Sequence, residues 1–169
     1  MLLRSAFNIA VIASANVAIA QPAVQLFGQV RELHTDRPIA HATIIAMDLD
    51  RPHDRTETPC DTSGRYSTRL AYGVLHKVEI AAEGYVTRHV LIDLRDVPHA
   101  ERIQGFDLLM DPTLFKPVEG LDHAVFAEEP TGICLYDRLR RTLIWDDAYI
   151  TSTRKLFQAF LDPRPSADE

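Results

Sequence analysis

Histidines and acidic residues are the side chains best suited to acid–base or metal chemistry at neutral pH. The HExxH motif of zinc peptidases and the G-x-S-x-G elbow of serine hydrolases do not occur in this chain. An enzyme would have to bring distant residues together, for example His41, His76 and Asp107. The histidines are scattered, and we expect surface or strand-edge positions for them. They are His34, His41, His53, His76, His89, His99 and His123.

Three aspartates in the segment DLDRPHD, which are Asp48, Asp50 and Asp54, could offer oxygen ligands to Ca²⁺. Ca²⁺ takes about six to eight oxygen ligands, and this segment lacks both the spacing and the closing glutamate of an EF-hand loop. We therefore expect a solvated acidic loop here, and the sequence predicts no metal site or cofactor.

The two cysteines, Cys60 and Cys134, could form a disulfide in an exported protein. Such a bridge would close a loop of roughly 75 residues and stabilise the fold by about 4 kcal/mol. Two free thiols buried as small apolar groups are the alternative. Neither cysteine lies in a nucleophile motif, which disfavours a catalytic thiol.

Residues 1–20 have the layout of a secretory signal peptide. One early cation, Arg4, precedes an apolar stretch that ends with the small residues Ala18 and Ala20. Cleavage after Ala20 would leave Gln21 at the N-terminus. An uncleaved membrane anchor is the alternative, but polar residues interrupt the apolar stretch, which is short for a membrane span. The sequence therefore predicts export to the periplasm or beyond, at a bacterial cell envelope.

The charge balance argues against nucleic acid as a partner. The mature chain would keep 24 acidic side chains against 17 basic ones, because the signal peptide removes only Arg4 from the 18 in the whole sequence. No Lys/Arg cluster is present to bind phosphates or anionic lipid. No other segment is apolar enough over a sufficient length to span a membrane, so we expect a chain that does not span one after cleavage.

The alternation of apolar and polar residues predicts an all-β domain. One example places Tyr66, Thr68 and Leu70 on the same face of a strand. No helical period occurs before residue 110, and the segment 51–59 is expected to be a polar loop. Predicted strands recur about every 8–15 residues, which is typical of a sandwich or barrel. They lie within 24–32, 39–50, 64–73, 74–84, 85–94 and 102–112.

The stretch CDTSGRY, residues 60–66, has the chemistry of a structural corner. The Asp61 side chain can accept hydrogen bonds from backbone N–H groups that follow it, and Gly64 permits a positive φ. Tyr66 then enters a strand, and we expect it to point inward. A turn of this kind needs no catalytic or metal-binding role.

A series of short motifs runs in a definite order between residues 24 and 110. Its members are Gly28, Val30, Pro38, Ala42, Asp61, Gly64, Tyr66, Gly84 and Tyr85. The series resembles the carboxypeptidase regulatory-like domain, although Cys60 stands where that family usually has threonine. The resemblance implies a seven-stranded, transthyretin-like Greek-key β-sandwich over residues 21–112.

Residues 113–161 are predicted to form a C-terminal extension packed on or beside the sandwich, followed by a disordered tail at 162–169. ICLYD and TLIWD indicate a β-hairpin, and AYITSTRKLFQAF indicates a helix. Three aromatic residues, Tyr136, Trp145 and Tyr149, could form a docking surface. Alternatively, they cover the open end of the sandwich.

These patterns predict a non-enzymatic binding or scaffolding module at the cell envelope. Members of the resembled family usually accompany other domains, which implies a partner in trans, either an envelope protein or a glycan. A small hydrolase or metal-dependent enzyme on the transthyretin fold, or a carbohydrate-binding module, is the alternative.

Overall fold

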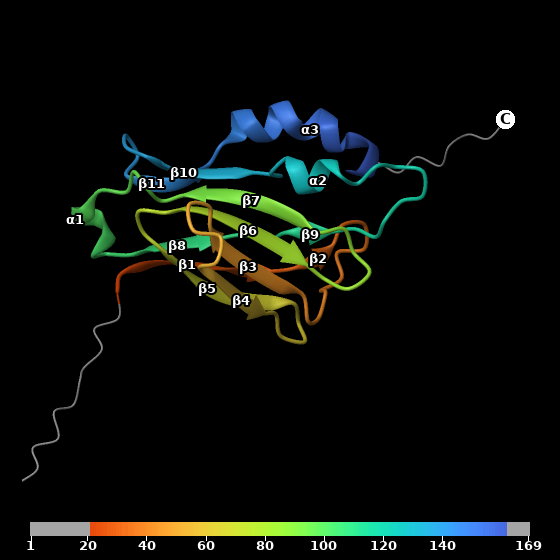
Figure 1. Cartoon of the computed structure of the whole chain (residues 1–169), viewed down its shortest axis with the longest axis horizontal. Coiled ribbons are helices and arrows are strands. Elements are labelled where there is room, and N and C mark those ends of the chain that lie inside the picture. The colour runs from red at the N-terminus through yellow and green to blue at the C-terminus, as the bar shows by residue number, and fades with distance from the viewer. Residues whose placement is uncertain (1–20, 162–169) are drawn as a thin grey trace, which may run out of the picture.

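The computed structural model describes residues 21–161, so the predicted signal peptide and the tail at 162–169 lie outside it. The fold is a sandwich of a three-stranded and a six-stranded sheet (Figure 1). The first has the order β5-β1-β8, with β1 (Ala23–Gln29), β5 (Arg65–Ala71) and β8 (Phe106–Leu109). The second has the order β11-β10-β7-β6-β3-β4, with β3 (Thr43–Asp48), β4 (Arg55–Pro59), β6 (Leu75–Ala81), β7 (Arg88–Asp93), β10 (Ile133–Asp137) and β11 (Thr142–Trp145).

Smaller elements connect and cover these sheets. A short parallel pair joins β2 (Arg31–Glu32) to β9 (Thr113–Leu114). The helices are α1 (His99–Arg102), α2 (Val125–Glu128) and α3 (Asp147–Leu161). Figure 1 shows α2 and α3 along one side of the molecule, beside β7 and β10. No helix in the described residues is long and apolar enough to cross a membrane.

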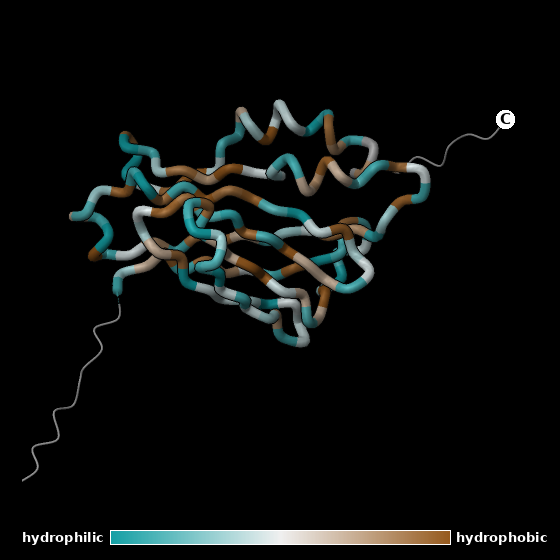
Figure 2. Tube along the Cα trace, viewed as in Figure 1, coloured by the Kyte–Doolittle hydropathy of each residue, from teal (hydrophilic) through white to brown (hydrophobic). Residues whose placement is uncertain are grey.

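The inward faces of the strands follow the predicted alternation. Tyr66, Thr68 and Leu70 of β5 are buried, and their neighbours in sequence are exposed. On β6, Val78 and Ile80 are buried in the same way. Figure 2 shows the apolar segments running along the strands inside the molecule and polar segments at many loops. The prediction of an all-β sandwich with a C-terminal hairpin and helix is therefore confirmed.

One local prediction is wrong. The segment 51–59 is not a loop throughout, because Arg55–Pro59 forms the edge strand β4 and pairs with β3. Its side chains are mostly exposed and polar, so no apolar alternation marks it in the sequence. The helix α1 precedes residue 110, and its four residues are too few to show a helical period.

The stretch CDTSGRY forms a tight corner leading into β5. The Oδ1 atom of Asp61 accepts hydrogen bonds from the Ser63 and Arg65 amides at 2.8 and 2.9 Å. Gly64 has a φ of 72°, and an added Cβ there would meet the Val30 carbonyl oxygen at 2.6 Å. A side chain at this position would therefore be both strained and obstructed.

The corner delivers Tyr66 to a contact that ties three strands together. Its hydroxyl donates a hydrogen bond to the Met110 carbonyl at 2.7 Å, just beyond the end of β8. Gly28 is the register partner of Tyr66 on β1, and a Cβ there would overlap the same carbonyl oxygen. The absence of a side chain at Gly28 is thus what allows the chain around Met110 to approach β1.

The C-terminal extension is part of the packed structure. Strand β10 pairs in parallel with β7, and its residues Cys134 and Tyr136 are buried in the main core. A second apolar cluster attaches α3, because Phe157 stacks on Phe126 at a ring-centroid distance of 4.7 Å and Phe160 lies 4.9 Å from the same ring. The six-stranded sheet is therefore incomplete without residues beyond Pro112.

We predict that a chain ending at Pro112 loses the cooperative unfolding transition of the full chain. It would lose β10, β11 and the apolar cluster around Phe126, Phe157 and Phe160. We expect this loss to lower the free energy of unfolding by at least about 5 kcal/mol. Urea denaturation followed by circular dichroism measures this. A control chain ending at Leu161 should unfold like the full chain. A full cooperative transition in the Pro112 variant would contradict the prediction and make the sandwich independently stable.

Candidate functional site

The residues suggested for a convergent enzyme site do not come together. His41 is exposed in the turn before β3, and His76 lies opposite Asp48 at the far end of that strand. The length of β3 between them is about 17 Å. Asp107 is exposed on β8 in the other sheet. Within residues 21–161, no group of three or more His, Cys, Asp or Glu side chains is placed to hold a metal ion.

Two histidines are buried, contrary to the expected surface positions. His76 bonds the Ala71 carbonyl through Nε2 at 2.9 Å, and His89 bonds the Phe126 carbonyl through Nδ1 at 3.0 Å. Burial lowers the pKa of both side chains below the ordinary value, so both are neutral at pH 7. His76 and Glu79 have the HxxE spacing of some zinc sites. Three residues apart on a strand, they point to opposite faces and cannot share a metal.

The acidic loop before β4 contains its own cation. Arg51 lies between two aspartates, with Nη2 2.8 Å from Asp48 and Nη1 3.2 Å from Asp54. Burial alone would raise the pKa of the Asp48 carboxyl. Hydrogen bonds from the Asp50 amide and Arg51 outweigh it, and the net pKa is lowered. The aspartates are thus arranged around an arginine.

The two cysteines are free and buried, so the disulfide suggested by their even number is not formed. Cys134 is on β10, and Cys60 follows β4, four strand positions across the same sheet. Four strand spacings amount to about 19 Å, whereas a disulfide needs Cα atoms within about 7 Å. Strand order, which the sequence does not reveal, decides this point.

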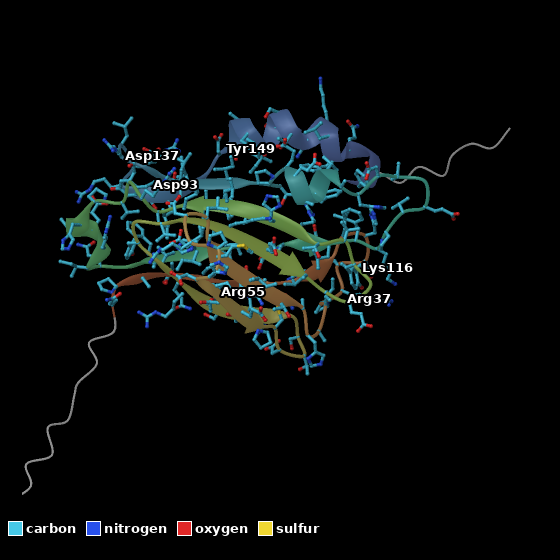
Figure 3. All side chains as sticks on the ribbon, in the orientation of Figure 1. Arg37, Arg55, Asp93, Lys116, Asp137 and Tyr149 are labelled. Atoms are coloured by element: carbon cyan, nitrogen blue, oxygen red, sulfur yellow. The ribbon has the colours of Figure 1, made fainter. Side chains whose placement is uncertain are left out.

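The three aromatic residues suggested for docking do not form an exposed patch. Tyr136 is buried in the core, and its hydroxyl donates to Glu101. Tyr149 lies where α3 begins, beside β10 in Figure 3, and its hydroxyl donates to the Pro130 carbonyl at 2.9 Å. Trp145 is partly buried and packs against the core. The three side chains therefore make their contacts within the fold.

A pocket of about 320 Å³ lies where the extension meets the sandwich, and we call it the seam pocket. One wall comes from β6, β7 and the segment 109–113, which runs from the end of β8 to the start of β9. Residues 131 and 132 lie directly beside β7, where the Leu91 amide donates to the Gly132 carbonyl at 3.0 Å. The other wall comes from the end of β11 and the start of α3. Its volume is that of a site for a small organic molecule. Its apolar lining includes Ile80, Val90, Leu109, Trp145 and Ile150.

Arg88 is the cation of the seam pocket. It is partly buried at the start of β7, and burial lowers the pKa of its guanidinium to about 10. No acidic side chain in residues 21–161 lies within the 4.0 Å ion-pair distance of it. Its guanidinium carbon lies 5.7 Å from the centre of the Phe126 ring. A cation removed from water in this way is normally paired with an anion.

One edge of the Arg88 guanidinium is unused. Nη1 donates to the Thr113 carbonyl at 2.7 Å and reaches the Thr113 hydroxyl at 3.4 Å. Nε is buried with no hydrogen-bond partner, and Nη2 donates to no group within residues 21–161. Nε–H and Nη2–H point in parallel from one side of the guanidinium, which is the arrangement that binds a carboxylate through both oxygens. One edge of the guanidinium is thus bonded to Thr113, and the other edge has no hydrogen-bond partner in the described part of the chain.

Gly132 lines the seam pocket between the side chains of Trp145 and Val90. A Cβ added at Gly132 would lie 3.5 Å from the Trp145 ring and 3.8 Å from a Val90 methyl group, both ordinary contact distances. Gly132 is not among the glycines with a positive φ. A methyl group could therefore enter the pocket at this point without strain in the backbone.

Sequence reasoning missed Arg88, although the signal is present. Arg88, Val90 and Ile92 alternate along β7, and the two apolar members face the core. A charged residue at a core-facing position in a strand is unusual unless it is paired. The apolar pattern predicts the strand, and the same pattern places Arg88 on the face that Val90 and Ile92 turn toward the core.

No family model matches the chain, and no curated protein matches it. Solved structures with partial similarity include catechol 1,2-dioxygenase from Acinetobacter sp. (11% identity, 64% of this chain and 57% of that chain, TM-score 0.45). They also include a candidate carbohydrate-binding protein from Bacteroides uniformis (10% identity, 55% of this chain and 41% of that chain, TM-score 0.38). A third is the pilus 2b backbone protein of group B streptococcus (14% identity, 57% of this chain and 42% of that chain, TM-score 0.38). The chain therefore spans less than two thirds of each. At this level of similarity the comparisons assign neither a substrate nor a partner.

We predict that neither thiol reacts with Ellman's reagent in the native protein at pH 8. Burial, together with the charge of Asp61, raises the pKa of Cys60 to about 11, and burial raises that of Cys134 to about 12. Less than about 1% of either thiol is then thiolate. Both should react once guanidinium chloride unfolds the chain. Rapid reaction of one equivalent in the native state would contradict the burial of that cysteine.

Proposed function

We propose that the chain is an exported, non-enzymatic β-sandwich module of the carboxypeptidase regulatory-like kind. Its function is to bind a small organic carboxylate in the seam pocket. The single observation that carries the proposal is the unpaired edge of Arg88 at a pocket that is lined largely by apolar side chains. The signal-peptide layout supports export, and the order of motifs from Gly28 to Tyr85 supports the family.

A carboxylate complements the chemistry of this edge. Charge-assisted pairs between arginine and carboxylate are commonly bidentate, and they strengthen where water is excluded. Nε is buried in the unliganded fold, so the proposed binding requires the guanidinium to rotate toward a bound carboxylate. Trp145 and Ile150 on the opposite wall then contact the apolar body of the ligand.

Arg88 could instead be a purely structural residue that links β7 to β9 through Thr113. The two roles differ in their effect on stability. A structural arginine would stabilise the fold, whereas a cation held ready for a ligand destabilises the unliganded fold, because its desolvation is not compensated. Removing the charge while keeping the volume distinguishes them.

We predict that Arg88→Met leaves the free energy of unfolding within about 0.5 kcal/mol of wild type, or raises it. Binding of 3-phenylpropionate should weaken about 10- to 100-fold, which matches the loss of a charge-assisted hydrogen-bond pair. Trp145 is the single tryptophan of the chain and lines the pocket, so its fluorescence reports binding directly. The neutral analogue 3-phenylpropanamide should bind wild type as weakly as the acid binds the variant.

Arg95→Met is the matched control for this experiment. It removes the same charge from an exposed arginine that pairs with Asp93 beyond the other end of β7. It should leave the affinity for 3-phenylpropionate unchanged. A loss of more than about 1 kcal/mol of stability in Arg88→Met would make Arg88 structural. Equal binding of the acid and the amide by wild type would contradict the carboxylate site.

Narrowing the pocket should separate binding from stability in a second way. We predict that Gly132→Ala leaves the fold as stable as wild type or more stable by up to about 1 kcal/mol, since the substitution restricts the unfolded chain and meets no clash. The added methyl group should weaken 3-phenylpropionate binding, while the smaller acetate loses less. Thermal unfolding and the same fluorescence titration measure both effects. An unchanged affinity for the larger acid would place its binding outside this pocket.

A further inference from the structure

A second charge lies at the seam pocket. Asp111 lines it, one residue after Met110, and is exposed to solvent. Its Oδ1 atom accepts a hydrogen bond from the Gln29 amide at 2.9 Å. Within residues 21–161, Asp111 makes no ion pair, either with Arg88 or with any other cation. One pocket therefore presents a cation and an anion that do not neutralise each other.

Backbone groups fix each of the two charged side chains separately. Arg88 is bound to the carbonyl of Thr113, and Asp111 lies two residues before Thr113 in the chain. Two residues span at most about 7 Å, so the aspartate and the anchoring point of the arginine are close neighbours. The Gln29 amide fixes the carboxylate of Asp111 by one oxygen and leaves the other oxygen available.

We infer that the ligand of the seam pocket is a free α-amino acid with an apolar or aromatic side chain. This inference rests on the proposed carboxylate site. The α-carboxylate binds the open edge of Arg88, and the α-ammonium binds the free oxygen of Asp111. The side chain contacts Trp145, Val90 and Ile150. A zwitterion satisfies both charges at once, whereas a simple carboxylate leaves Asp111 as a like charge near its own carboxylate.

The two charges also distinguish a free amino acid from a peptide end. A C-terminal residue has the carboxylate but an amide in place of the ammonium, and an N-terminal residue has the reverse. The pocket volume of about 320 Å³ lies at the lower end of the range for small-molecule sites, which suits a single residue.

The test compares four probes by Trp145 fluorescence in the purified protein: L-phenylalanine, 3-phenylpropionate, N-acetyl-L-phenylalanine and 2-phenylethylamine. L-Phenylalanine absorbs too little at the tryptophan excitation wavelength to interfere. We expect phenylalanine to bind at least 10-fold more tightly than either acid without an ammonium, and we expect the amine to bind weakest. Asp111→Asn should remove the advantage of phenylalanine and leave 3-phenylpropionate binding equal or tighter. The asparagine oxygen can still accept the Gln29 hydrogen bond, so the fold should be retained.

The outcomes separate this inference from the function on which it rests. If 3-phenylpropionate binds wild type as tightly as phenylalanine, and both depend on Arg88, the amino-acid inference fails and the carboxylate site stands. If neither compound binds, the carboxylate site fails as well. Asp107→Asn removes the same charge from an exposed position on β8 and should not change the ratio of the two affinities. A changed ratio in this control would attribute the preference to net charge rather than to Asp111.

Discussion

The hydrogen bond from Tyr66 to the Met110 carbonyl is the contact on which the rest of the structure depends. The bond satisfies the buried Met110 carbonyl and joins β5 to the segment that follows β8. The two approach each other at Gly28, where a side chain would not fit. The Met110 amide donates in turn to the Phe27 carbonyl at 2.9 Å. Residue 110 is thereby held to β1 by its amide and to β5 by its carbonyl, with no room for a side chain at Gly28 between them.

From that point the chain is fixed along the next four residues. The Pro112 carbonyl accepts from the Arg31 amide at 3.0 Å, and the Leu114 carbonyl accepts from the Leu33 amide at 2.8 Å. This clamped segment forms one wall of the seam pocket, and it supplies both Asp111 and the carbonyl that binds Arg88. The corner at residues 60–66 has no catalytic group. Through the Tyr66 hydrogen bond it nevertheless helps to fix the segment that carries Asp111 and the Thr113 carbonyl.

The sequence predicted those parts of the fold that depend on local pattern. Alternation along β5 and β6 reveals which face is buried, and Asp61 with Gly64 indicates the corner, because turn chemistry is local. The outcome for Cys60 and Cys134 depends on strand order, and the roles of Tyr136 and Trp145 depend on β10 joining the larger sheet. Such non-local pairings leave no periodic signal. Arg88 was overlooked for a different reason, since a single charge in an apolar strand has meaning only once its partners are known.

The unpaired state of Arg88 is more informative than its position. The chain has an excess of acidic residues, and elsewhere its arginines are paired readily: Arg51, Arg95 and Arg141 all contact carboxylates within 3 Å. A partner for Arg88 would need only one acidic substitution on a neighbouring element. Thr113, which binds its Nη1 edge, and Thr131, which bonds to the carbonyl of His89 on the same strand as Arg88, are both neutral. A carboxylate within reach of the guanidinium would offset its desolvation in the unliganded fold. An unpaired donor edge costs stability in the unliganded fold, and under the proposed function a bound carboxylate would offset that cost.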